Sequence, residues 1–198
     1  MKVVYSTSSI REQDIVFETP HTLTSNNTIG VSEIATFGDA QVEVNYPPYK
    51  MFDNSTDFSI NHTASTNPST SNHGILGWWT RDKLKVSSIK VTNTTYTNSY
   101  QLHTGKIQVS NNTSDGINGT WTDLTTYSNP SQTAGAEWYI PIPENKQGYY
   151  QAYRFYMDTG YNYQRIGELN IVGTYRGVPE IAEYSWAAPC EHKWCIRY

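Results

Sequence analysis

The sequence predicts an all-β fold, a jelly-roll β-sandwich, on two observations. Short segments alternate apolar and polar side chains, and no run of ten or more residues has the apolar spacing of an amphipathic helix without β-branched or turn residues. Short strands at loop-sized spacings are typical of sandwiches and jelly rolls. With 198 residues, a single core with short additions is expected.

Alternation places the individual strands. The first is expected at Gln41 to Tyr46, with Val42, Val44 and Tyr46 facing the core. The same pattern predicts later strands at 86–91, 106–110, 138–140, 153–157 and 169–172. Core packing is expected for most of the tryptophans that lie in or beside these strands, which are Trp78, Trp79, Trp121 and Trp138. Polar loops at 61–77, 92–105 and 111–119 separate the strands, and such loops commonly carry recognition.

Composition excludes several classes of function. The net charge is −4 and no basic run occurs, so the footprint of a nucleic-acid-binding protein is missing. No stretch approaches the roughly 20 apolar residues of a membrane span, so no membrane insertion is expected. Motifs for a nucleophile elbow, a zinc protease or a phosphate-cradling loop are absent from the sequence. We therefore expect a binding protein and not an enzyme.

The two ends suggest attachments. We expect an N-terminal arm or added strand at 1–33, a sandwich at 34–175 and a C-terminal tail at 176–198. The start lacks the apolar region of a signal peptide, which indicates a mature form or release by another route, such as lysis of a phage host. Cys190 and Cys195 lie in the tail, where a disulfide, a partner contact or a free tail is expected in preference to a zinc clip.

Four blocks of sequence, in order, resemble the discoidin family, also called coagulation-factor type C domains, and related galactose-binding carbohydrate-binding modules. The blocks are Pro48 to Asp57, then 77–80 with 85–91, then 105–111 with 119–124, then 153–156 with 165–173. The resemblance implies a galactose-binding-like jelly roll that binds glycans or other surface ligands with loops at one end. Such domains often include a structural calcium ion. The resemblance does not imply catalysis.

The resemblance also implies where a calcium ion would sit. The aspartate of the first turn and the glutamate before the last strand meet at one cation site in the family, and the matching residues here are Asp53 and Glu168. Thr56 and Asp57 are further candidates because calcium takes six to eight oxygen ligands. Alternatively, Asp53 forms only an Asx turn, and Glu168 only an ion pair, for example with Arg154 or Arg165.

Sugar binding needs aromatic side chains for the apolar face of a pyranose and polar groups for its hydroxyls. The candidates on the predicted loops are His62, His73, Tyr100, His103, Tyr161, Asn162 and Tyr163. Galactose-binding members of the family tend to have an arginine after the strand that corresponds to 86–91, where this chain has Thr92 to Tyr96. This departure argues against galactose as the ligand.

These expectations combine into a glycan-binding or cell-surface-binding module within a phage virion, as part of a tail, fibre or head appendage. The arm and tail would contact other virion proteins or copies of the same chain. One alternative is a purely structural virion protein that has lost its ligand. Another is the carbohydrate-binding module of a secreted glycoside-active enzyme, which would be extracellular.

Overall fold

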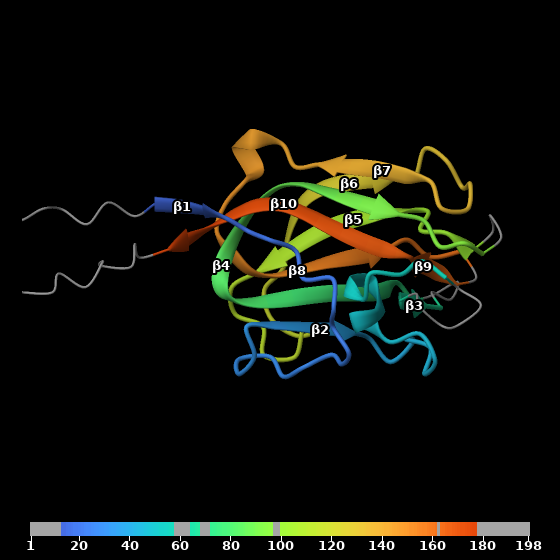
Figure 1. Cartoon of the computed structure of the whole chain (residues 1–198), viewed down its shortest axis with the longest axis horizontal. Coiled ribbons are helices and arrows are strands. Elements are labelled where there is room, and N and C mark those ends of the chain that lie inside the picture. The colour runs from blue at the N-terminus through green and yellow to red at the C-terminus, as the bar shows by residue number, and fades with distance from the viewer. Residues whose placement is uncertain (1–12, 58–63, 68–71, 97–99, 162, 178–198) are drawn as a thin grey trace, which may run out of the picture.

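The computed structural model describes residues 13–57, 64–67, 72–96, 100–161 and 163–177, and these form a two-layered β-sandwich (Figure 1). The all-β prediction is confirmed. The described helices are two short 3-10 turns, η1 (Pro48–Phe52) and η4 (Glu144–Lys146). No helix among the described residues has the length and apolar character needed to cross a bilayer.

One long strand, β4 (Gly74–Thr92), belongs to both layers. Its first half pairs with β2 (Ile34–Gly38) and β8 (Tyr150–Met157), and its second half pairs with β7 (Glu137–Pro141) and β10 (Glu168–Gly177). Between the halves the register shifts at exposed, polar residues 81–83, where the strand turns from one layer into the other. A continuous strand therefore folds back on itself at the end of the molecule that carries β1 (Figure 1).

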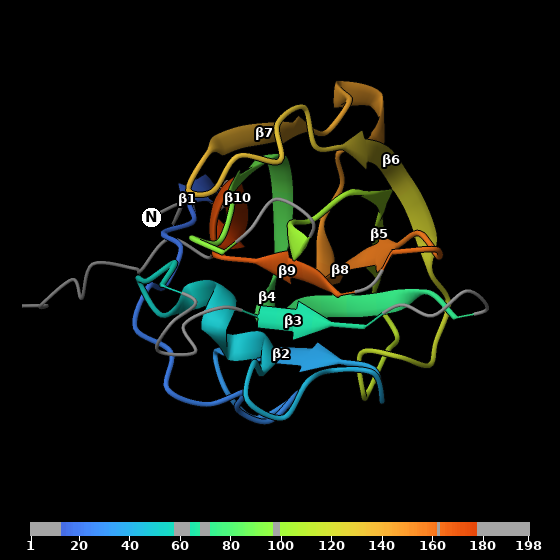
Figure 2. The same ribbon diagram turned by 90° about the vertical axis from the view of Figure 1, so that its right-hand side faces the viewer.

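The remaining strands complete the layers. The first layer gains β5 (Thr104–Ser110) beside β8, and then β6 (Thr122–Ser128). The second layer gains β1 (Gln13–Val16), which pairs antiparallel with the last residues of β10. A separate two-stranded sheet, β3 (Ala64–Thr66) with β9 (Gln164–Ile166), lies across one end of the sandwich (Figure 2).

Apolar side chains from both layers meet in one large core. Trp78 is fully buried, with its ring stacked on Tyr153 at 5.3 Å between ring centres. Trp138 is buried in the same core, and Trp79 is buried in a smaller cluster on the other face of the first layer. Trp121 is half-buried and packs against that smaller cluster. Core packing was thus correctly predicted for three of the four tryptophans considered.

The strand expected at Gln41 to Tyr46 is wrong. Val42 forms only an isolated bridge with Thr66, and Val44 is 93% exposed. The carboxylate of Asp39 accepts a hydrogen bond from the backbone N–H of Gln41, and the N–H of Val42 donates to the carbonyl oxygen of Asp39. These local turns use the backbone groups that a strand would have needed, since an aspartate side chain competes well for them.

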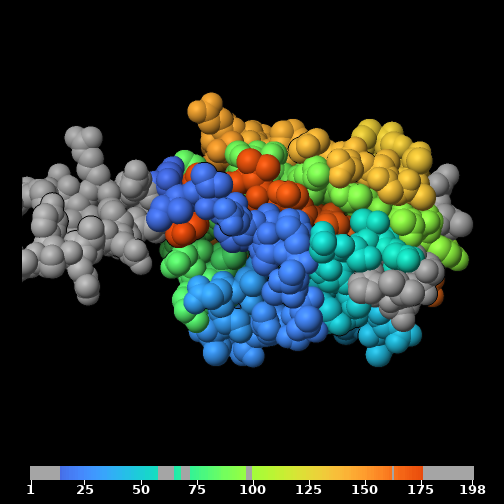
Figure 3. Space-filling view, in the orientation of Figure 1, coloured from blue at the N-terminus to red at the C-terminus, as the bar shows by residue number. Residues whose placement is uncertain are grey.

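The segment expected as an arm lies along the side of the sandwich where the structure describes it. Beyond β1, the N–H of Phe17 donates to the carbonyl oxygen of Gly173, and that of Leu23 donates to Phe52. Figure 3 shows this blue segment lying against the segment that contains η1, shown in cyan. Of the predicted tail, Arg176 and Gly177 end β10, and Cys190 and Cys195 lie outside the described residues.

Candidate functional site

The connections between strands gather at the end of the sandwich that carries β3 and β9, which faces the viewer in Figure 2. We call this the loop end. Its described residues are 39–57, 64–67, 72–73, 93–96, 100–103, 129–136, 158–161 and 163–167. Two groups of side chains stand out at this end and at the strand residues next to it: a pair of carboxylates and a cluster of tyrosines.

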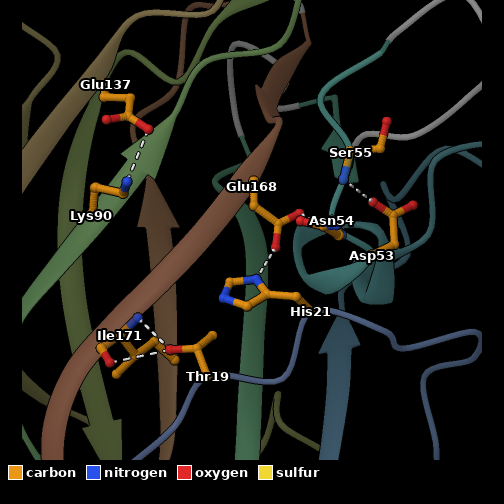
Figure 4. A network of polar contacts seen from close by, with 9 residues as sticks. All are labelled: Thr19, His21, Asp53, Asn54, Ser55, Lys90, Glu137, Glu168 and Ile171. Carbon is orange, nitrogen blue, oxygen red and sulfur yellow. Dashed lines mark hydrogen bonds and ion pairs between the residues drawn. The ribbon is translucent and has the colours of Figure 1, made fainter.

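The carboxylate pair consists of Asp53, directly after η1, and Glu168, the first residue of β10 (Figure 4). Asn54 between them adopts a left-handed conformation with φ 62°, which asparagine tolerates. This turn directs the N–H of Asn54 to Oε2 of Glu168 at 3.1 Å, while the N–H of Ser55 donates to Oδ1 of Asp53. The first and last blocks of the family-like sequence therefore meet in space.

Each carboxylate also faces a basic side chain. Nδ1 of His21 lies 2.7 Å from Oε1 of Glu168, and Nζ of Lys50 lies 3.7 Å from Oδ2 of Asp53. Burial raises the pKa of Glu168 to about 8, and the charge of Asp53 adds to this rise against the opposing effect of nearby backbone N–H groups. Glu168 therefore holds its proton more tightly than an exposed glutamate does.

Backbone groups of the other two predicted metal ligands are engaged in hydrogen bonds. The carbonyl oxygen of Thr56 already accepts hydrogen bonds from the N–H and Oγ1 of Thr95, and the N–H of Asp57 donates to Oγ of Ser55. A polar hollow of about 300 Å³ adjoins Glu168 and is lined in part by Thr56. Among the described residues, no group of three or more His, Cys, Asp or Glu side chains is arranged to hold a metal ion. A cation here would depend on two carboxylates supplemented by neutral oxygen atoms.

The alternative reading of these residues is partly right. Asp53 does form an Asx turn, through Ser55. The suggested partners of Glu168 are wrong, because Arg165 pairs with Glu43 and Arg154 donates to Gln108 and Ile117. The actual partner, His21, comes from the predicted arm, and its distance in sequence explains why no local pattern indicated the contact.

The tyrosine cluster consists of Tyr46, Tyr96, Tyr100 and Tyr163, which are half-buried and surround the side chain of Arg165. Tyr96 and Tyr100 are stacked with ring centres 5.3 Å apart, and Tyr163 meets Tyr100 edge to face at 5.5 Å. Offset or edge-to-face arrangements at such distances are favourable between aromatic rings. Rings from three separate loops thus meet at one place on the loop end.

The predicted sugar-binding residues fall into three groups. Tyr100 and Tyr163 belong to the tyrosine cluster. His103 and Tyr161 form a separate stacked pair at 4.1 Å, also at the loop end. His73 is stacked on Tyr156 at 4.3 Å, and its Nδ1 lies 2.8 Å from the carbonyl oxygen of Met157.

Two of the predicted binding residues are not described by the structure, and three residues of the site were not predicted. His62 and Asn162 lie outside the described residues. Tyr46, Tyr96 and Arg165 were not among the expected binding residues. Tyr46 was expected to face the core from a strand, and Tyr96 lay in a predicted polar loop. No sequence pattern marked Arg165 as part of the site, because the three loops come together around it only in the folded chain.

Comparison with known proteins gives matches in structure only. No sequence-family model and no curated protein matches the chain. An F5/8 type C domain from Bacteroides fragilis aligns with a TM-score of 0.58 at 15% identity, covering 75% of this chain and 96% of that one. The family 32 carbohydrate-binding module of C. perfringens NanJ, solved with galactose, aligns with a TM-score of 0.56 at 17% identity, covering 80% and 99%.

A third match is the fucolectin from the serum of striped bass, Morone saxatilis, with a TM-score of 0.58 at 17% identity over 73% of this chain and 47% of that one. Together these matches confirm the resemblance drawn from the four sequence blocks, and at these identities they establish the fold. The chain has the galactose-binding-like β-sandwich found in F5/8 type C, or discoidin, domains.

Proposed function

We propose that the chain is a non-catalytic glycan-binding module that contacts its ligand with the loop end of the sandwich. The observation that carries this proposal is the convergence of the tyrosine cluster on that end. The structural matches support it, since they include a carbohydrate-binding module solved with galactose and a fucolectin.

Tyrosine suits this role chemically. Its ring covers the apolar face of a pyranose, and its phenol group donates and accepts hydrogen bonds with sugar hydroxyls. Tyr100 and Tyr163 are half-buried, so each ring is held by neighbours and still partly open to solvent. The stacked pair His103 and Tyr161 at the same end provides further ring and nitrogen groups for a second sugar unit.

A glycan array followed by titration calorimetry tests the proposal. We expect the wild-type protein to bind a subset of glycans, and Tyr100→Ala and Tyr163→Ala to weaken binding at least tenfold. The matched control is Tyr139→Ala, because Tyr139 is 61% exposed on β7, away from the tyrosine cluster. Equal loss in all three variants, or unchanged binding in the first two, would contradict this placement of the site.

As for the setting, we favour a module of a secreted carbohydrate-active protein. One structural match is the module CBM32-3 of a family 31 glycoside hydrolase from Clostridium perfringens. The structures named above give no support to a phage virion. The purely structural virion protein remains an alternative, and a glycan array without hits would favour it.

We also propose a calcium ion at Asp53 and Glu168. Two partly buried carboxylates lie near enough there for the charge of Asp53 to raise the pKa of Glu168, and oxygen ligands of this kind suit a hard cation. Asp57 is close in sequence and is a further candidate, whereas the carbonyl oxygen of Thr56 is engaged by Thr95. When bound, calcium would neutralise the two carboxylates and join η1 to the start of β10.

A further inference from the structure

Arg165 lies almost completely inside the loop end, with 5% of its surface exposed. Its Cζ atom is 5.1 Å from the ring centre of Tyr46, 5.3 Å from Tyr96, 4.8 Å from Tyr100 and 5.2 Å from Tyr163. A guanidinium within about 6 Å of a tyrosine ring is attracted by its π electrons, more strongly when water is excluded. One cation thus contacts every ring of the tyrosine cluster.

The charge of Arg165 is already used within the protein. Its Nη2 lies 3.3 Å from Oε2 of Glu43, and its Nε donates to Oγ of Ser65 at 3.2 Å. Ser65 in turn donates to the same carboxylate. The backbone is held as well, since Arg165 pairs with Ser65 in the β3–β9 sheet and forms a parallel bridge with Gln101. The guanidinium is therefore fixed in position and largely inaccessible to a ligand.

The four rings come from three separate loops. Tyr46 follows the turns after β2, Tyr96 and Tyr100 lie between β4 and β5, and Tyr163 lies between β8 and β9. A common anchor fixes these loops before a ligand arrives, and this reduces the entropy cost of binding. Arg165 occupies the place where such an anchor is needed.

The surroundings of the cluster are acidic. Carboxylates outnumber basic side chains at the loop end and in the strand residues next to it, where the described acidic residues are Asp39, Glu43, Asp53, Asp57, Glu137, Asp158 and Glu168. The basic residues there are Lys50, Lys90, Lys106 and Arg165, and each of these faces a carboxylate. An acidic ligand would therefore meet repulsion without gaining a free cation.

We propose that Arg165 is the positioning residue of the tyrosine cluster, and that the site it prepares discriminates against acidic glycans. The proposal rests on the glycan-binding function argued above. It assigns Arg165 no direct contact with the ligand: the residue acts by holding the rings, and its charge is balanced by Glu43.

The positioning role is tested by fluorine NMR on protein labelled with 3-fluorotyrosine. The variant is Arg165→Met with Glu43→Gln, which removes both members of the ion pair and leaves no unbalanced buried charge. We expect the resonances of the four clustered tyrosines to shift or broaden, while those of Tyr139 and Tyr153 stay in place. If the cluster resonances do not change, Arg165 does not position the rings.

Arg165→Lys is a second variant, in case the double variant does not fold. It keeps the positive charge and loses the planar group that contacts the rings. We expect this variant to change the same four resonances in a protein that still melts cooperatively. Unchanged resonances here would overturn the positioning role on their own.

The binding role is tested on an array with lactose, 2′-fucosyllactose and chitotriose as neutral probes, and 3′-sialyllactose and 3′-sulfolactose as acidic ones. We expect the wild-type protein to bind a neutral probe at least tenfold more tightly than an acidic one. The Arg165 variants should weaken neutral binding about tenfold and keep the preference. Preferred binding of an acidic probe that is lost in the variants would show direct contact with Arg165 and overturn the proposal.

The two experiments separate the proposals. If the wild-type protein binds none of the glycans, the proposed function fails, yet the NMR measurement still decides whether Arg165 positions the rings. If it binds neutral glycans and the variants bind equally well, the function stands and the role of Arg165 is refuted.

Discussion

The imidazole of His21 and the carboxyl group of Glu168 share a hydrogen bond of 2.7 Å between Nδ1 and Oε1. The bond joins the segment after β1 to the start of β10, across 147 positions of sequence. Because burial and the charge of Asp53 raise the pKa of Glu168 to about 8, its proton equilibrium differs between the folded and unfolded chain.

This difference predicts how stability depends on pH. A carboxyl group with a raised pKa binds its proton more tightly in the folded state, so it favours folding most at a pH below its unfolded pKa of about 4.5. The benefit is lost as pH rises through the folded value near 8. We expect the melting temperature of the metal-free protein to fall between pH 5 and pH 8, and Glu168→Gln to flatten this slope.

The control for this measurement is Glu137→Gln. Glu137 pairs with Lys90, and its side chain is 55% exposed, so this surface ion pair is expected to contribute little to stability. Its variant should show the wild-type slope. Identical slopes in the wild-type and Glu168→Gln proteins would show that Glu168 titrates normally.

Calcium is expected to bind at Glu168, and its effect on the melting temperature should grow as pH rises, the opposite of the trend in the metal-free protein. In the proposed site, calcium would bind ionised Glu168 but not protonated Glu168, so added calcium is expected to raise the melting temperature more at pH 8.5 than at pH 5. Adding a chelator should lower it at pH 8.5, and Asp53→Asn should abolish both effects. A melting curve that a chelator leaves unchanged would exclude the calcium proposal.

Asn93 is the centre of a buried hydrogen-bond network. It is fully buried, and its Oδ1 accepts from Asn129 and from Nε1 of Trp138, each at 3.0 Å. Its Nδ2 donates to the carbonyl oxygens of Ser131 and Thr133, each at 2.8 Å. The whole hydrogen-bonding capacity of the amide is therefore used to hold the loop after β6.

Asn93→Ala is expected to lower the free energy of unfolding by about 3 kcal/mol, because it leaves buried donors and acceptors without partners. Urea denaturation measures this directly. The control is Asn45→Ala, at an exposed position, with an expected change under about 0.5 kcal/mol. Similar values for both variants would mean that water replaces the network without cost.

Two buried tryptophans should respond differently to the same substitution. Nε1 of Trp138 donates to Asn93, whereas Nε1 of Trp78 has no hydrogen-bond partner among the described residues. Trp138→Phe removes a bonded donor and Trp78→Phe an unbonded one, so the first should cost about 1 to 2 kcal/mol more. Urea denaturation of both variants checks this, and equal losses would contradict the hydrogen-bond argument.

Much of the fold is predictable from sequence, because the alternation of apolar and polar side chains indicates which side of a strand is buried. The strands expected at 106–110, 138–140, 153–157 and 169–172 all lie within strands of the structure. Alternation over six residues failed at Gln41 to Tyr46, where Asp39 fixes local turns. Nor did it show that 77–80 and 85–91 belong to a single strand, since the bend depends on packing of the two layers.

The candidate site was predictable only in part. Asp53 and Glu168 were expected to meet through the family resemblance, and they do. No local sequence pattern indicated that Tyr46 and Tyr96 lie around Arg165. A contact between a cation and aromatic rings on distant loops does not recur at a fixed interval along the sequence. Such contacts depend on chain topology, which the alternation of apolar and polar residues does not indicate.

Tyr163 has a strained backbone conformation. Its φ of +49° is the left-handed conformation that only glycine adopts freely, and a bulky residue there is strained by about 1 to 2 kcal/mol. Tyr163→Gly removes the ring and the strain together, whereas Tyr163→Ala removes the ring and keeps most of the strain. We therefore expect the glycine variant to be more stable than the alanine variant by about 1 kcal/mol in urea denaturation.

Both variants should lose glycan affinity to the same extent, because both lack the ring that meets Tyr100 at 5.5 Å. That combination of higher stability with lost binding would show that the strain is retained for the ligand, as expected where a functional site overrides local preference. Equal stability of the two variants would remove the strain argument. Wild-type affinity in the glycine variant would remove Tyr163 from the binding surface, since the backbone alone would then be sufficient.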